Sequence, residues 1–203
     1  MIFERLSIAI PEPKIELEYE SPYTLLVAVI LSAQATDKMV NKITPKLFSV
    51  AKTPQQMCNL GEEKLKEYIK SINYFNNKAK NIVNASRILM SEYNSNIPST
   101  LKELTTLPGI GRKSANVILN TIYGHATVAV DTHVFRVSNR LGLCNTTTPY
   151  DTEIAICKVI PQRFIPDAHH LLVLHGRYIC KARKPSCNEC TIADLCSYNH
   201  NKI

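Results

Sequence analysis

Apolar residues in this chain recur at intervals of three and four positions, with polar and charged residues between them. Clear examples run from Tyr23 to Ile30 and from Ala79 to Met90. Such spacing places the apolar side chains on one face of an α-helix. The pattern therefore predicts amphipathic helices in both places.

Further helices are predicted where similar runs are flanked by Pro, Gly, Asn, Asp, Ser or Thr, which commonly start and stop helices. Only Thr127 to Val130 is strand-like, and it is too short to found a sheet. The predicted fold is therefore all-α, with many short helices. The additional helices are expected at Asp37 to Val50, Glu62 to Lys70, Leu101 to Thr105, Ser114 to Tyr123, Thr132 to Leu141, Asp151 to Ile160 and His169 to Ile179.

Composition adds a prediction about partners. The 203 residues are 45% hydrophobic, as in a globular protein, and carry a formal net charge of +7, which favours a polyanionic partner. Nucleic acid fits better than membrane, because the longest apolar run, Leu25 to Leu31, is far short of the roughly 20 residues that span a bilayer. The N-terminal segment contains acids and prolines where a signal peptide has its apolar core, so we expect a cytoplasmic, nucleoid-associated protein.

Four of the seven cysteines crowd into one short C-terminal stretch: Cys180, Cys187, Cys190 and Cys196. Without an export signal, such clustering indicates a metal site rather than disulfides. Four thiolates suit either a tetrahedral zinc ion or an iron-sulfur cubane. The spacing alone leaves both open.

The segment from Leu101 to Tyr123 is typical of two helices joined by a tight turn. Pro108 is expected to end the first helix, Gly109 and Gly111 allow backbone conformations or close approaches that a side chain would block, and the second helix begins near Arg112. Backbone N–H groups at that helix start suit one DNA phosphate. The alternative is a helical hairpin used only for packing, but the basic neighbours favour phosphate.

Two polar residues near this turn are candidates for chemistry. Lys113 lies in the first turn of a helix, where the helix dipole disfavours a cation, so its position suggests an anionic partner or a reactive amine. An uncharged amine is a nucleophile that can form a Schiff base, although a second phosphate-binding lysine fits equally well. Asp131 precedes "THVFRV" and, taken alone, is best explained as a helix N-cap.

At these residues the chain resembles a known family. "LPGIGRKSANVILNTIYG" followed by "AVDTHVFRVSNRLGL" resembles the helix-hairpin-helix motif and catalytic aspartate segment of the endonuclease III family of DNA glycosylases. "LLVAVILSAQATDKMVN" and "HHLLVLHGRYICKARKPSCNECTIADLC" are similar to the family in the same order. The resemblance thus covers nearly the whole chain.

The resemblance implies a two-module protein. Residues 15–125 would form a six-helix barrel that carries the hairpin, and residues 1–14 with 126–203 would form an iron-sulfur cluster module, with the active site in the cleft between them. The implied activity is that of a bifunctional DNA glycosylase and abasic-site lyase in base excision repair. We expect a monomer that acts on double-stranded DNA containing oxidised pyrimidines or abasic sites.

The resemblance also assigns roles to residues. It matches the active lysine to Lys113 and the catalytic carboxylate to Asp131, and it implies a structural [4Fe-4S] cluster held by the four clustered cysteines. The loop between the first two cysteine ligands is basic and a good platform for phosphates. The phosphate-binding residues expected in that loop and in the hairpin are Lys181, Arg183, Lys184, Gly109, Gly111 and Arg112.

Chemistry on a nucleotide requires its rotation out of the duplex and filling of the gap. The resemblance places Gln34, in "SAQATD", as one residue that fills the gap. The family usually offers a leucine as a second wedge, whereas this chain has Tyr74, in "SINYFNNKA", and an aromatic ring can also stack in a base gap. His133 is expected to pack rather than to act in the cleft.

Three other functions compete with this one. An adenine-specific mismatch glycosylase on the same scaffold would lack the hairpin lysine. A non-catalytic DNA-binding module is disfavoured by the paired presence of Lys113 and Asp131. A zinc-stabilised structural protein would contain zinc and no iron.

Overall fold

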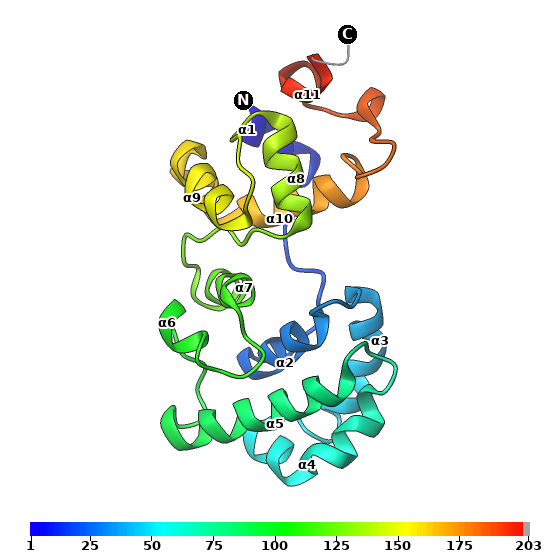
Figure 1. The fold of residues 1–203 in the computed structure, drawn as a ribbon, viewed down its shortest axis with the longest axis vertical. Helices are drawn as coiled ribbons and strands as arrows, with labels where there is room; N and C mark the ends of the chain where they lie inside the picture. Colours follow the sequence, from blue (N-terminus) through cyan, green and yellow to red (C-terminus); the bar gives the residue numbers. More distant parts are fainter. Residues whose placement is uncertain (201–203) are drawn as a thin grey trace. The chain divides into compact units, whose positions relative to one another are not determined.

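The computed structural model describes residues 1–200 and divides the chain into two compact units (Figure 1). The hairpin unit is Glu16–Tyr123, and the cysteine unit combines Met1–Ile15 with the chain from Gly124 onward. No β-strand occurs in residues 1–200, so the all-α prediction is confirmed. The strand-like expectation for Thr127 to Val130 is wrong: Val128 and Val130 are buried in a core, but no second strand pairs with this segment.

The hairpin unit is organised around one buried helix, α2 (Pro22–Ser32). Every residue from Tyr23 to Leu31 is buried, because this helix is apolar on all sides and its neighbours cover it. Its contacts reach three other helices of the unit. These are α3 (Asp37–Phe48), α5 (Phe75–Glu92) and α7 (Arg112–Tyr123), while α4 (Pro54–Ile69) packs along α5, and α6 (Leu101–Leu104) against α7.

Hydroxyl side chains begin many of these helices. Ser21 and Thr24 form a reciprocal capping box at α2, and threonine side chains accept a backbone N–H at the starts of α3, α4 and α6. Helix α4 starts earlier than predicted because Thr53 and Pro54 supply an N-cap and a first-turn proline; Gly61, at φ 76° and ψ 165°, kinks it where the start was expected.

The first hairpin helix is also shorter than predicted. Helix α6 ends at Leu104, so Pro108 does not terminate it. The chain instead continues through successive tight turns, in which Thr106 N bonds to Glu103 O and Leu107 N bonds to Leu104 O. Pro108 therefore lies within the turn of the hairpin.

The cysteine unit consists of α1 (Ile2–Ala9), α8 (Thr132–Leu141), α9 (Pro149–Val159), α10 (Ile165–Tyr178) and α11 (Ser197–His200), with short 3₁₀ turns. Helix α10 contacts both α8 and α1. Phe3 and Leu6 of α1 belong to the same buried core as Val137, Leu171 and Cys196. The N-terminal helix therefore completes a core that is otherwise built from the C-terminal third of the chain.

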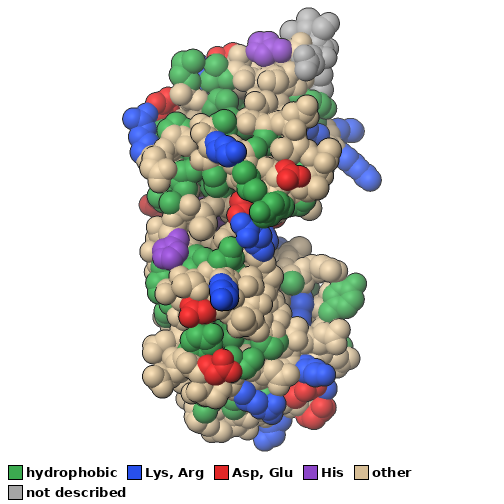
Figure 2. All heavy atoms as spheres, turned by 60° about the vertical axis from the view of Figure 1, so that its left-hand side comes forward, with side chains coloured by type: hydrophobic (Ala, Val, Ile, Leu, Met, Phe, Trp, Pro, Cys, Tyr) green, Lys and Arg blue, Asp and Glu red, His purple; other side chains and the backbone are tan. Residues whose placement is uncertain are grey.

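No helix in residues 1–200 has both the length and the apolar character of a membrane span. On the face drawn in Figure 2, acidic and basic side chains are interspersed. The positive charge of the chain is thus not gathered into one block on that face.

Candidate functional site

The two glycines of the hairpin meet different requirements. Gly109 has φ +85°, and a Cβ there would lie 3.2 Å from the side chains of both Asn81 and Ile30. The fold therefore needs glycine at this position. Gly111 is not in the left-handed region, and nothing lies within 4 Å of a Cβ built there. Packing within the hairpin unit gives no reason for Gly111, which leaves open space beside the backbone.

Helix α7 starts directly after Gly111, whose carbonyl accepts from Ala115 N at 2.9 Å. The first amides of a helix have no partner within it, so they can bind an anion. The side chains of Arg112 and Lys113 are both exposed there. The Lys113 amine forms no hydrogen bond or ion pair with residues 1–200. The Lys113 amine is therefore accessible to a molecule that binds at the hairpin.

Asp131 is the N-cap of α8 in the cysteine unit. Its Oδ1 accepts from His133 N and Val134 N, both at 2.8 Å. Its other oxygen, Oδ2, has no partner within residues 1–200. Since the side chain is only half-buried, this oxygen can contact a bound molecule while the cap stays intact.

Gln34 and Tyr74 lie on two loops of the hairpin unit, and both side chains are exposed; Tyr74 keeps 63% of its surface accessible. Both residues have left-handed backbones, with φ of 54° and 59°. The two loops line one shared pocket, which includes Gln34, Thr36, Ser71 and Asn73. Gln34 and the residue before Tyr74, Asn73, therefore line the same pocket.

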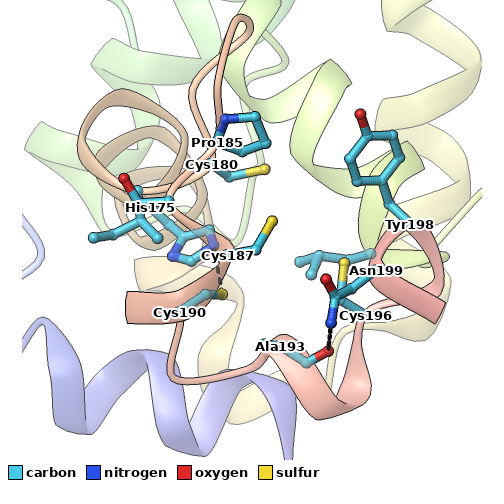
Figure 3. A pocket seen from close by; sticks show the side chains of 12 residues that line it. His175, Cys180, Pro185, Cys187, Cys190, Ala193, Cys196, Tyr198 and Asn199 are labelled. Atoms are coloured by element: carbon cyan, nitrogen blue, oxygen red, sulfur yellow. Dashed lines mark hydrogen bonds between the residues drawn. The ribbon is translucent and has the colours of Figure 1, made fainter. Parts of the chain in front are cut away.

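The four clustered cysteines surround a single pocket in the cysteine unit (Figure 3). Burial raises the pKa of the Cys190 thiol, and the charges of the other three cysteines raise it further. Within residues 1–200, no three His, Cys, Asp or Glu side chains converge closely enough to hold a single metal ion. Four cysteine thiolates around one pocket can hold either a tetrahedral zinc ion or an iron-sulfur cubane.

Two arginines of α8 organise the loop around Cys180. The Arg140 guanidinium donates to Cys180 Sγ at 3.5 Å and to the carbonyls of Lys181 and Ala182 at 2.8 and 3.0 Å. Arg136 donates to the carbonyls of Gly176 and Cys180. The sequence analysis missed both arginines; their separation of four residues, which places them on one helix face, was the available signal.

His175 completes the surroundings of the cysteines. Its Nε2 lies 3.8 Å from Cys190 Sγ, and burial lowers the pKa of the imidazole to about 4, so the ring is neutral. His133 lies against Gly176 of α10, and its Nδ1 accepts from Arg136 at 3.3 Å. His133 thus packs within its unit.

The basic loop projects from this framework. Lys181, Arg183 and Lys184 are all exposed, and Lys184 has a left-handed backbone at φ 53°. Arg140 fixes the start of the loop through its bonds to two carbonyls, and cysteines bound it at both ends. The loop therefore offers a fixed set of cations to a polyanion.

Family models match both parts of the chain. Residues 27–162 match the HhH-GPD superfamily of base excision DNA repair proteins, and residues 180–196 match the iron-sulfur binding domain of endonuclease III. The second match starts at Cys180 and ends at Cys196, so it spans the four clustered cysteines. The chain carries a [4Fe-4S] cluster.

Individual relatives are similar over almost their entire lengths. Endonuclease III of Rickettsia conorii is 54% identical over 98% of this chain and 95% of the relative, and that of Escherichia coli is 51% identical over 97% and 93%. A structure of a trapped endonuclease III–DNA covalent intermediate, with an estranged adenine, matches at 39% identity and a TM-score of 0.92, covering 98% of this chain and 94% of the other. A non-covalent endonuclease III–DNA complex matches with a TM-score of 0.93, at 39% identity over 99% and 94%. This chain belongs to the endonuclease III family, within the HhH-GPD superfamily of base excision DNA repair proteins.

Proposed function

We propose that this bifunctional DNA glycosylase and abasic-site lyase excises oxidised pyrimidines from double-stranded DNA and then nicks the strand, using Lys113 and Asp131. The proposal extends to a monomer that works on the chromosome in the bacterial cytoplasm. The DNA-bound structures of endonuclease III and the bacterial relatives support DNA as the partner.

One observation carries the proposal. Lys113 stands exposed in the first turn of α7, two residues after Gly111 with its open space, and has no partner in residues 1–200. A lysine at a helix start gains nothing from the helix dipole, so its position calls for a role outside the fold. An amine beside a phosphate-binding hairpin is in place to attack the deoxyribose of the same nucleotide strand.

The chemistry can be written from these groups. The Nζ lone pair of Lys113 attacks C1′, and the N-glycosidic bond breaks with its electrons leaving on the base, which takes up a proton. The amine loses a proton, the C1′–O4′ bond opens with protonation of O4′, and an imine joins the lysine to the sugar. Loss of a 2′ proton then forms the C2′=C3′ bond and expels the 3′ phosphate. Water finally hydrolyses the imine and restores the lysine.

Asp131 supports the first of these steps. Positive charge develops on the sugar as the base departs, and a carboxylate oxygen near C1′ stabilises it. Oδ1 is used by the α8 cap, so Oδ2 is the oxygen that we assign to this role. The N-cap role and the catalytic role are therefore compatible.

The remaining predicted residues would hold the DNA. The hairpin backbone at Gly109 and Gly111, with Arg112, would bind one phosphate, and the basic loop between Cys180 and Cys187 would bind others. Gln34 and Tyr74 would fill the gap left by the rotated nucleotide. We propose that residues 15–125 and residues 1–14 with 126–203 act as the two DNA-binding modules, the first carrying Lys113 and the second Asp131.

The cluster is assigned a structural role. Cys180, Cys187, Cys190 and Cys196 would hold it in the pocket that they line, where it would join the basic loop to the core of the cysteine unit. The bonds that Arg140 makes to Cys180 and to the loop would act with it.

The test is the Lys113→Gln variant, assayed on duplexes that contain thymine glycol or an abasic site. Glutamine keeps a polar side chain of similar length but cannot form an imine. We expect DNA binding to persist while strand nicking and the borohydride-trapped adduct both disappear, as measured by gel electrophoresis of labelled duplex.

The matched control is Lys102→Gln, which removes an exposed lysine of α6 in the same unit. It should nick and form adduct like the unmodified enzyme. Nicking at an unchanged rate by Lys113→Gln would remove Lys113 from the mechanism.

A further inference from the structure

A buried lysine lies behind the loop that carries Gln34. Lys78 of α5 is only 5% exposed, yet it is not paired with an acid in residues 1–200. Its Nζ donates to Leu31 O at 2.8 Å and to Ala33 O at 2.6 Å. These carbonyls belong to the last residues of α2, where a helix leaves acceptors unsatisfied and its dipole is negative. The ammonium thus satisfies two carbonyls at the C-terminal end of α2.

This arrangement is costly to maintain. Desolvation lowers the pKa of Lys78, because a buried ammonium loses its hydration. Many helices satisfy their last carbonyls with backbone N–H groups alone, whereas here Leu31 and the C-cap residue Ala33 receive a buried ammonium. A buried lysine without an acidic partner therefore indicates that the conformation of the chain after Ala33 is important for function.

A second polar contact holds the same loop from the other side. Asn73 Nδ2 donates to Gln34 O at 3.2 Å. Gln34 itself adopts a left-handed backbone, which persists in a non-glycine residue only when its surroundings impose it. A turn closed by the bond from Ala35 N to Ser32 O at 3.1 Å surrounds Gln34 locally. Asn73 and Lys78 add contacts from the segment that contains Tyr74, whose carbonyl accepts from Lys78 N at 3.1 Å.

We propose that Lys78 is a positioning residue for gap filling: with Asn73, it ties the Gln34 loop to the Tyr74 loop, so that the two side chains enter the duplex as one preset pair. The proposal rests on the gap-filling roles given under Proposed function. Lys78 does not touch the reacting atoms. Its effect appears only when a base pair must be opened and the gap filled.

That last feature separates positioning from a purely structural role. A single-stranded abasic oligonucleotide has no pair to open, so its nicking depends on Lys113 but not on the two loops. Excision of thymine glycol from a duplex depends on both. Displacing a side chain by about 1 Å can lower a rate by about 100-fold, so a shifted Gln34 should be measurable.

The experiment compares Lys78→Met and Asn73→Ala with the exposed-lysine control Lys80→Met, which lies one half-turn away on α5. For both test variants we expect duplex excision to fall about 10-fold or more, with single-strand nicking and borohydride trapping unchanged. A 2-aminopurine opposite the lesion should report incomplete gap filling as a smaller fluorescence change. Lys80→Met should match the unmodified enzyme in all three assays.

Asn73→Ala keeps the test decisive if Lys78→Met folds poorly, because Asn73 is exposed and loses one hydrogen bond. Unchanged duplex excision, or an equal loss on duplex and single strand, would overturn the inference. If the unmodified enzyme itself forms no trapped adduct, the proposed function fails instead, so the two failures are distinguishable.

Discussion

The two carboxylate oxygens of Asp131 have different surroundings. Oδ1 accepts from the first amides of α8, whereas Oδ2 has no partner within residues 1–200 and is the oxygen that we propose for catalysis. The sequence alone predicted the cap, because an acid before an apolar-periodic run is a common helix start. The catalytic role came only from the resemblance, since a cap and a catalytic acid look identical in one sequence.

The Asp131→Asn variant separates these tasks. Asparagine caps helices about as well as aspartate, so the free energy of unfolding should change by less than about 1 kcal/mol. Removal of the charge should slow base excision by about 100-fold, as for loss of one group that stabilises a transition state. Thermal melting and single-turnover excision check the two effects.

Asp131→Ala is the companion variant, because it removes the cap as well. It should cost about 1 kcal/mol of stability in addition to activity. Normal excision by the asparagine variant would rule out the proposed role of Oδ2.

At the scale of elements, most helices could be predicted because their start signals are local. The predicted bounds of α8 are those observed, and serine or threonine caps mark several other starts. The misses have physical causes. Helix α1 is short and becomes stable by packing Phe3 and Leu6 against distant residues, which no local pattern contains. The segment Thr127 to Val130 is apolar because Val128 and Val130 pack into the same core, not because it belongs to a sheet.

The hairpin shows a second limit of local reasoning. Gly109 and Gly111 look alike in the sequence, but only Gly109 has a positive φ and close neighbours. We therefore expect Gly109→Ala to destabilise the protein by about 2 kcal/mol, from left-handed strain and crowding against Asn81 and Ile30. Urea unfolding measures this change.

Gly111→Thr should instead leave stability unchanged and weaken DNA binding. Threonine is about as good an N-cap as glycine, so stability should stay within roughly 0.5 kcal/mol. Its side chain would fill the space that we assign to a DNA phosphate, so affinity for duplex should fall several-fold in a titration at fixed salt. Equal DNA affinities of Gly111→Thr and the unmodified protein would show that the phosphate lies elsewhere.

At the scale of the whole molecule, the cysteine spacing left zinc and iron-sulfur open. The family match over residues 180–196 and the endonuclease III relatives decide for the iron-sulfur cluster. The spacing of Arg136 and Arg140 indicates a shared helix face, but the partners of these arginines and of Lys78 could not be predicted, because they are backbone carbonyls 40 or more residues away. Every residue has a backbone carbonyl, so the sequence does not indicate which carbonyl a side chain will bind.

Removal of the iron should affect the two units unequally. Without the cluster, residues 180–200 lose the link among their four cysteines, and hydrogen exchange should accelerate there and in the adjacent parts of α8 and α10. The amides of buried α2 in the hairpin unit should keep their protection. Mass spectrometry of exchanged peptides from the holoprotein and the chelator-treated protein makes the comparison.

Cys190→Ser should reproduce the accelerated exchange, whereas Cys157→Ser, which changes an exposed cysteine outside the pocket, should not. Loss of protection throughout both units would show that the cluster supports the whole chain rather than one unit.

The cysteine unit is assembled from both ends of the polypeptide, since Phe3 and Leu6 are buried with residues beyond position 128. A ribosome releases α1 first, long before α8 and α10 exist to cover it. During synthesis, the hairpin unit can therefore fold while Phe3 and Leu6 of α1 are still exposed to solvent. These two side chains become buried only after α8 and α10 have been synthesised and have packed with them.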